Sequence, residues 1–331
     1  MNTYGKHFNS YNSRSFLIPA VSSGLKSQLK FMVLKNISVF ILVIILFAFT
    51  QCSQSQQKED NKDKNKGREH TSSFESPPGY DLNNPYKVNL RTELDEISGI
   101  QYYAKDTSIF AVTDDKGSLY KIHLSGNLAI EKWKFSKGQD YEDLSLVDST
   151  FYVLASNGNI TAFKFLLSEG LLTDTYSLNK GGKNEFEILY SDTAAGKLVV
   201  ICKDCENDTK KAVTAYSFDP KSKTFAGTPF FTINSEEIAD KGGMDKIKFK
   251  PSAAGINPKT NELFIISSIN KALVVMDRNG NVKSVYPLDP KIYKQPEGLT
   301  FTPSGDLIIS NEAAEVGAAE VLIFKYKSTA K

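Results

Sequence analysis

Six side chains with oxygen ligands occupy related positions along this chain of 331 residues and could share one site. Four are glutamates that introduce a short apolar stretch, and an Asn-Glu pair closes a later one. Calcium prefers several flexible oxygen ligands, whereas zinc and copper prefer nitrogen and sulfur. We therefore predict a calcium site. Its candidate ligands are Glu96, Glu142, Glu187, Glu297, Asn311 and Glu312.

These glutamates belong to a repeat that must position them. Copies begin at residues 96, 142, 187, 252 and 297, and the steps between them are 46, 45, 65 and 45 residues. The copy at 252 lacks the acid. A period in the forties with strand-like content is typical of a β-propeller. The long step holds an insertion of about 20 residues, which a loop can absorb. Five copies favour five blades, and a degenerate sixth could lie in the insertion.

The residues between the copies support this fold. Turn sequences such as Asp-Asp-Lys-Gly at 114–117 and Arg-Asn-Gly-Asn at 278–281 separate β-branched runs, as in hairpins. Residues 86–90 alternate before the first copy, and we expect them to pair with the last strand, 320–326, and close the ring. Residues 234–243 predict a short capped helix that ends at glycine.

The first strand of a propeller blade lines the central channel, so the glutamates should approach one another there. Carboxylates crowded in a partly dehydrated space repel, and either some keep their protons or a cation enters. Two alternatives need no metal. The acids could face water at the channel mouth, or they could pair with Lys250, which lies in the repeat without an acid.

The amino terminus is typical of an exported protein. Residues 37–49 form an apolar run, too short to span a bilayer but suitable as a signal-peptide core. Lys35 precedes this run, and we take Met32 as the true start of a signal peptide within residues 1–51.

The signal peptide ends at Phe49-Thr50-Gln51-Cys52, which resembles the cleavage box of bacterial lipoproteins. We expect Cys52 to carry the lipid, the alternative being a secreted protein with an unpaired cysteine. Residues 52–80 are polar and predict a disordered tether, which leaves 81–331 as the propeller.

Charge excludes a nucleic-acid partner. The formal net charge is +2, but five cations and no acid precede Cys52, which leaves −3 beyond it. Such a domain offers no basic face for phosphates. The membrane, through the lipid, is the partner that the sequence predicts.

Cys202 and Cys205 are the other two cysteines. The domain has no further Cys or His pair to complete a zinc site, and the cysteines follow a strand and do not start a helix. In an exported protein we expect a local disulfide in a turn at the end of the strand.

Six motifs together resemble the SdiA-regulated domain family of bacterial exported propellers over about residues 84–326. The resemblance implies a propeller and calcium but no settled activity. The motifs are Glu96-Ile-Ser-Gly-Ile100, Asp140-Tyr-Glu-Asp-Leu144, Asn184-Glu-Phe-Glu187, Lys250-Pro-Ser-Ala253, Gln295-Pro-Glu-Gly-Leu299 and Ser310-Asn-Glu312.

We expect a lipid-anchored, monomeric, calcium-binding module or scaffold in the outer membrane or at the cell surface, with the periplasm as the alternative location. Its partner would be an unidentified envelope protein or small molecule. The alternative is a calcium-dependent hydrolase of lactones or phosphoesters, in which the metal activates water. The domain's single histidine, His123, lies within a strand and is expected to be structural or solvent-facing. Glu297 or Glu312 would then act as the base.

Overall fold

The computed structural model describes residues 74–126, 128–165, 171–245, 247–314 and 317–328. The predicted signal peptide, Cys52 and the tether as far as residue 73 lie outside these ranges. In the described part, no helix has the length and apolar character needed to cross a membrane.

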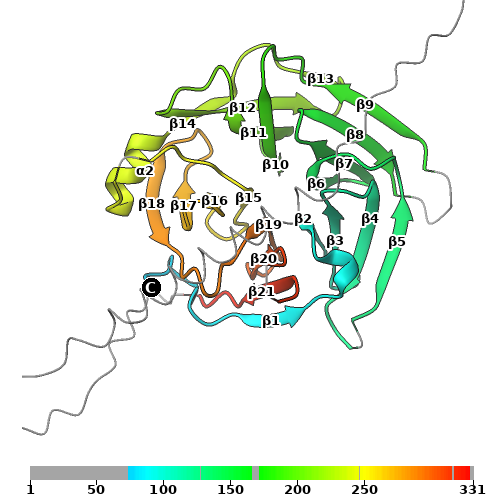
Figure 1. The fold of residues 1–331 in the computed structure, drawn as a ribbon, viewed down its shortest axis with the longest axis horizontal. Helices are drawn as coiled ribbons and strands as arrows, with labels where there is room; N and C mark the ends of the chain where they lie inside the picture. Colours follow the sequence, from blue (N-terminus) through cyan, green and yellow to red (C-terminus); the bar gives the residue numbers. More distant parts are fainter. Residues whose placement is uncertain (1–73, 127, 166–170, 246, 315–316, 329–331) are drawn as a thin grey trace, which may run out of the picture. The chain divides into compact units, whose positions relative to one another are not determined.

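Five antiparallel sheets follow one another around a common axis in the described residues (Figure 1). The first strands of neighbouring sheets, β2, β6, β10, β15 and β19, contact one another in sequence, and β19 returns to β2. The described chain is thus a closed five-bladed β-propeller, as predicted, and the insertion adds no sixth sheet to it.

In three of the five blades the strands run in chain order from the channel outward, and the third and fifth blades differ at their outer edges. Blade 1 comprises β2 (Ile97–Tyr103), β3 (Ser108–Thr113), β4 (Ser118–His123) and β5 (Ile130–Lys134). Blade 2 comprises β6 (Tyr141–Val147), β7 (Thr150–Ala155), β8 (Asn159–Lys164) and β9 (Thr173–Ser177). Blade 3 comprises β10 (Asn184–Asp192), β11 (Lys197–Cys205), β12 (Ala212–Asp219), β13 (Thr224–Phe225) and β14 (Phe231–Asn234). Blade 4 comprises β15 (Ala253–Ile256), β16 (Leu263–Ser267), β17 (Ala272–Met276) and β18 (Val282–Pro287).

The fifth blade combines the two ends of the domain. It contains β19 (Pro296–Phe301), β20 (Leu307–Asn311), β21 (Glu320–Phe324) and, outermost, β1 (Tyr86–Asn89). β1 lies along β21, with Val88 opposite Val321, and the chain then enters blade 1 through a short 3-10 helix, Thr92–Leu94 (Figure 1). This pairing covers the edge of β21 and confirms the predicted closing strand.

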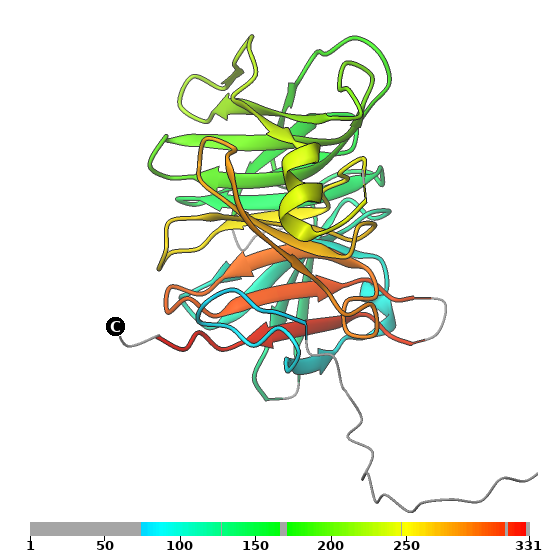
Figure 2. The ribbon, with the colours of Figure 1, turned by 90° about the vertical axis from the view of Figure 1, so that its left-hand side faces the viewer.

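The insertion forms β13, β14 and the helix α2 (Ser235–Gly242). The Asn234 side chain accepts a hydrogen bond from the backbone of Glu236 at 2.9 Å, and Gly243 ends the helix with a φ of 59°. This confirms the predicted capped helix. α2 packs against β18 of the next blade (Figure 2).

The hydrophobic core lies between the blades, one cluster for each pair of neighbours. Between blades 1 and 2, for example, the rings of Phe110 and Phe151 meet edge to face at 4.7 Å. The chain joins this core before residue 81, because Tyr80 is 8% exposed and its hydroxyl donates to the Gly305 carbonyl at 2.6 Å. Tyr80, which we placed in the tether, is therefore packed on the propeller.

Candidate functional site: the acidic mouth of the channel

The inner strands of blades 1, 2, 3 and 5 each contain a β-bulge at the same point. A bulge inserts an extra residue and re-aims its side chain, and it is common beside functional sites. The bulges of β6, β10 and β19 carry Glu142, Glu187 and Glu297. The repeat therefore gives three blades an acid at the same point of the strand that borders the channel.

Glu96 does not occupy the equivalent position. The bulge of β2 contains Ser98 and Gly99, so Ser98 matches the three glutamates, and Glu96 is exposed just before the strand. We aligned the first repeat with the others by its acid, Glu96. Strand pairing places the bulge of this repeat two residues later, so that alignment was wrong by two residues. In blade 4, Ser252 directly precedes β15, which has no bulge.

One lysine, Lys203, forms ion pairs with the acids of the channel mouth. Its ammonium lies 2.6 Å from a carboxylate oxygen of Glu187 and 3.2 Å from one of Glu185. Burial alone would lower the Lys203 pKa, but Glu187 and Glu185 raise it above its ordinary value. We call Lys203, Glu142, Glu185, Glu187 and Glu297 the lysine-centred group.

Three carboxyls of the lysine-centred group resist ionisation. Burial, followed by the charge of Glu187, raises the pKa of Glu142 to about 10. Burial raises the pKa of Glu187 to about 8 and also raises that of Glu297, although Lys203 opposes both shifts. One ammonium is thus insufficient for the charge that these side chains would carry when fully ionised.

A second set consists of Glu96, Asp114 and Glu312, and we call it the carboxyl triad. No basic side chain in the described ranges forms an ion pair with it. Burial, then a hydrogen bond with the Glu96 carboxyl and the charge of Glu297, raises the pKa of Glu312 to about 8. Burial and the charge of Glu96 raise the Asp114 pKa. The Gln295 amide donates to Oε2 of Glu312.

Three buried oxygens on residues of this set or next to it in sequence accept no hydrogen bond. They are Asp95 Oδ1, Asp114 Oδ1 and Asn311 Oδ1. The Asn311 amide nitrogen is occupied, since it donates to the Ile292 carbonyl at 2.8 Å and to Glu320 at 3.1 Å. Buried acceptors without donors are costly unless a cation, a water or a proton satisfies them. The donor set and its charge therefore fit a hard divalent cation.

The carboxylates are not drawn together around a point. Among the described residues, only Cys202, Cys205 and Asp208 place three potential ligand atoms within 4.8 Å of one another. The two sulfurs of that set are joined in a disulfide. Side chains of the carboxyl triad would have to rotate to hold one ion together.

The disulfide lies within β11 and not in a turn beyond it, since this strand continues to Cys205. It frames Lys203, which reaches the channel acids, and Asp204, which pairs with Lys250 at 2.8 Å and with Lys248 at 2.5 Å. Lys250 is thus bound to Asp204, and Lys203 is the cation that the sequence analysis missed. Its place between two cysteines opposite Glu187 was the available signal.

His123 is not near these acids in the sheet. It lies in β4, the third strand of blade 1, and its Nε2 is 2.8 Å from a carboxylate oxygen of Glu131. The expected structural or solvent-facing role fits this position.

The other end of the channel is different. A cavity of about 600 Å³ is lined there by the inner strands of all five blades, including Gln101, Ser145 and Thr300. Asp143 borders it and is buried, with the backbone amides of Leu144 and Leu189 each donating to its carboxylate at 2.8 Å. A side chain at Gly99 would collide with this carboxylate, which explains the glycine.

Comparison with known proteins supports the family resemblance. The model of the SdiA-regulated family matches residues 78–180, which confirms the resemblance over that part of the chain. No curated protein matches the sequence.

Solved structures give weaker likenesses. A luciferin-regenerating enzyme is 11% identical with a TM-score of 0.46, over 74% of this chain and 96% of its own. A streptogramin B lyase is 13% identical with a TM-score of 0.40, over 71% and 67%. Virginiamycin B lyase from Staphylococcus aureus is 12% identical with a TM-score of 0.40, over 74% and 75%. Likenesses this low indicate neither an activity nor a ligand.

Proposed function

We propose that this chain is a lipid-anchored propeller of the cell envelope that binds calcium at the acidic mouth of its channel and serves there as a binding module. The observation that carries the proposal is the carboxyl triad. Besides burial, the carboxyl of Glu96 raises the pKa of both Glu312 and Asp114, and no basic side chain in the described ranges forms an ion pair with the three acids.

Calcium would be held by Glu96, Asp114 and Glu312, with Glu297 nearby. The lysine-centred group already has an ammonium, so a divalent cation gains less there. The bound ion would supply positive charge and coordination for oxygens that now lack partners. Within the chain, the Gln295 amide and the disulfide-framed Lys203 orient the surrounding acids.

Calorimetric titration of the full chain with calcium, and thermal melting with and without chelator, test this function. We expect heat of binding and a higher melting temperature with calcium, because a ligand of the native state stabilises it. Both should be lost in the double variant Glu96→Gln/Glu312→Gln. The control is Glu131→Gln, an exposed glutamate on the outermost strand of blade 1. Absence of heat and of any melting shift would contradict the proposal.

The lipid anchor rests on the sequence around Cys52 and has its own test. Radiolabelled palmitate should enter the wild-type chain in a bacterial host and not a Cys52→Ser variant. Equal labelling of both would contradict the anchor and leave the calcium proposal standing.

A hydrolase is the second candidate, and the pKa of about 8 for Glu312 favours it. A carboxylic acid that retains its proton near neutral pH can act as a general acid. Lactones and phosphoesters should be assayed with and without calcium. Hydrolysis that depends on calcium and falls in Glu312→Gln would replace the binding module by an enzyme.

A further inference from the structure

A second cavity lies between blades 2 and 3, away from the acids. Its volume is about 720 Å³, which is the size of a pocket for a small organic ligand. It is bordered by Val147 at the end of β6, whereas Glu142 lies near the start of that strand. Five residues of strand span about 17 Å, so the cavity opens toward the other face of the propeller from the acids.

The inner wall of this interblade cleft is apolar. Tyr152 and Ala162, from β7 and β8, line it and are almost entirely buried. Leu171 and Tyr176 extend the wall toward the surface. This wall can bury the hydrocarbon or aromatic body of a ligand.

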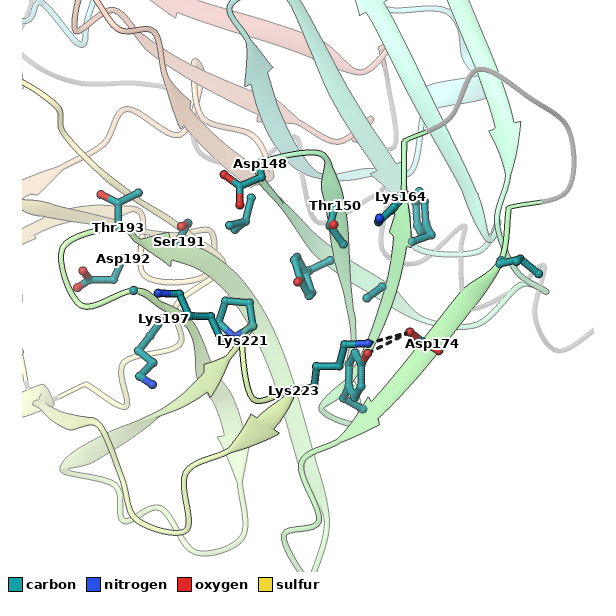
Figure 3. A pocket seen from close by; sticks show the side chains of 18 of the residues that line it. Asp148, Thr150, Lys164, Asp174, Ser191, Asp192, Thr193, Lys197, Lys221 and Lys223 are labelled. Carbon is teal, nitrogen blue, oxygen red and sulfur yellow. Dashed lines mark hydrogen bonds and ion pairs between the residues drawn. The ribbon is translucent and has the colours of Figure 1, made fainter.

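The rim of the interblade cleft carries more free positive than free negative charge. Lysines 164, 197, 221 and 223 and aspartates 148, 174 and 192 surround it (Figure 3). Several of these charges are already neutralised. Lys197 lies 2.7 Å from Asp219, and Lys223 lies 3.5 Å from Asp174. Asp192 is paired with Arg278.

Three rim charges remain. Within the described chain, Lys164 and Lys221 form no ion pair, and Asp148 is the rim carboxylate that forms none. Lys223 lies beside the aromatic part of the wall, since its ammonium is 5.9 Å from the centre of the Tyr176 ring. The Tyr176 hydroxyl donates to Asp174 at 3.2 Å. A ligand with a negative group and an apolar body would satisfy both the rim and the wall.

We propose that the interblade cleft binds a small amphiphilic organic anion, with its acidic end at the rim that carries Lys164 and Lys221 and an apolar body against Tyr152 and Tyr176. The site is independent of calcium, because it lies at the opposite end of β6 from Glu142 and shares no residue with the carboxyl triad.

A pair of fluorescent probes separates the two parts of this proposal. The anionic probe is 8-anilinonaphthalene-1-sulfonate, and N-phenyl-1-naphthylamine is its uncharged counterpart. Binding of both to the full chain is followed by fluorescence in chelator. The sulfonate should bind more tightly. Lys164→Glu and Lys221→Glu should each weaken the sulfonate about fivefold, as expected for an exposed ion pair, and leave the neutral probe unchanged.

Two further variants locate the probes. Ala162→Met should weaken both by filling the apolar wall, and circular dichroism reports whether it folds. Lys134→Glu, an exposed lysine on β5 of blade 1, is the matched control and should change neither. Sulfonate binding that is absent, or unaffected by both lysine reversals, would overturn the proposal, as would equal loss in Lys134→Glu.

Discussion

Calcium binding at the carboxyl triad should release protons, and the number of protons can be worked out from Glu312. Burial, the hydrogen bond with Glu96 and the charge of Glu297 raise its pKa to about 8. At pH 7 such a carboxyl is protonated in about nine molecules of ten. Because a cation binds the ionised form, each calcium should displace about one proton from this side chain.

The affinity should therefore depend on pH in a defined way. Between pH 6 and 7 the association constant should rise about tenfold, which is about 1.4 kcal/mol, and above pH 8 it should level off. Calorimetry in buffers of different ionisation enthalpy counts the released protons directly. In Glu312→Gln, the release should disappear together with most of the affinity.

Glu142→Gln is the control for this experiment, because Glu142 belongs to the lysine-centred group and also has a raised pKa. It should leave the proton count unchanged. Heats that do not depend on the buffer, with an affinity that stays flat from pH 6 to 8, would refute the reasoning. Loss of the proton release in Glu142→Gln would move the ion to the other group.

Three further predictions concern the acids and the closure of the ring. Without calcium, the melting temperature should fall as pH rises from 5 to 9, because burial raises the folded-state pKa of Glu142 from 4.5 to about 10 and the folded protein binds the extra proton in that window; Glu142→Gln should reduce the slope, and an unchanged slope would contradict this. At pH 9, Lys203→Met should cost up to about 3 kcal/mol of unfolding free energy, because it leaves the buried, ionised Glu187 without its cation; the loss should be smaller at pH 5, where Glu187 is neutral, and a loss independent of pH would be evidence against the ion pair. Leu90→Ala, at the closing strand and 6% exposed, should cost about 3 kcal/mol in denaturant unfolding, whereas Tyr86→Ala, 67% exposed, should cost little; equal effects would argue that the closure does not stabilise the ring.

The sequence was sufficient for the fold because each blade repeats one local pattern. Strand alternation, glycine turns and the spacing of the copies predicted five blades, a closing strand over 86–90, which is observed at 86–89, and a helix over 234–243, which is observed at 235–242. The predicted position of the disulfide, in a turn beyond the strand, was wrong, since β11 continues to Cys205. Such errors arise where tertiary pairing extends a strand beyond its apolar core.

The site was only partly predictable. Spacing placed Glu142, Glu187 and Glu297 correctly at equivalent positions, but the bulge of β2, which depends on pairing with β3, assigns that position to Ser98. The division of the acids into two groups depends on Lys203, whose direction is set by the disulfide and strand register. The interblade cleft has no sequence motif, because its walls come from two blades.

The central claim, that one calcium ion binds at the carboxyl triad, is tested most directly by equilibrium dialysis with radioactive calcium. At pH 8 the account predicts one ion bound per full-length chain, and none in Glu96→Gln/Glu312→Gln. Glu142→Gln should still bind one. No bound ion in the wild type, or one ion retained by the double variant, would contradict the claim.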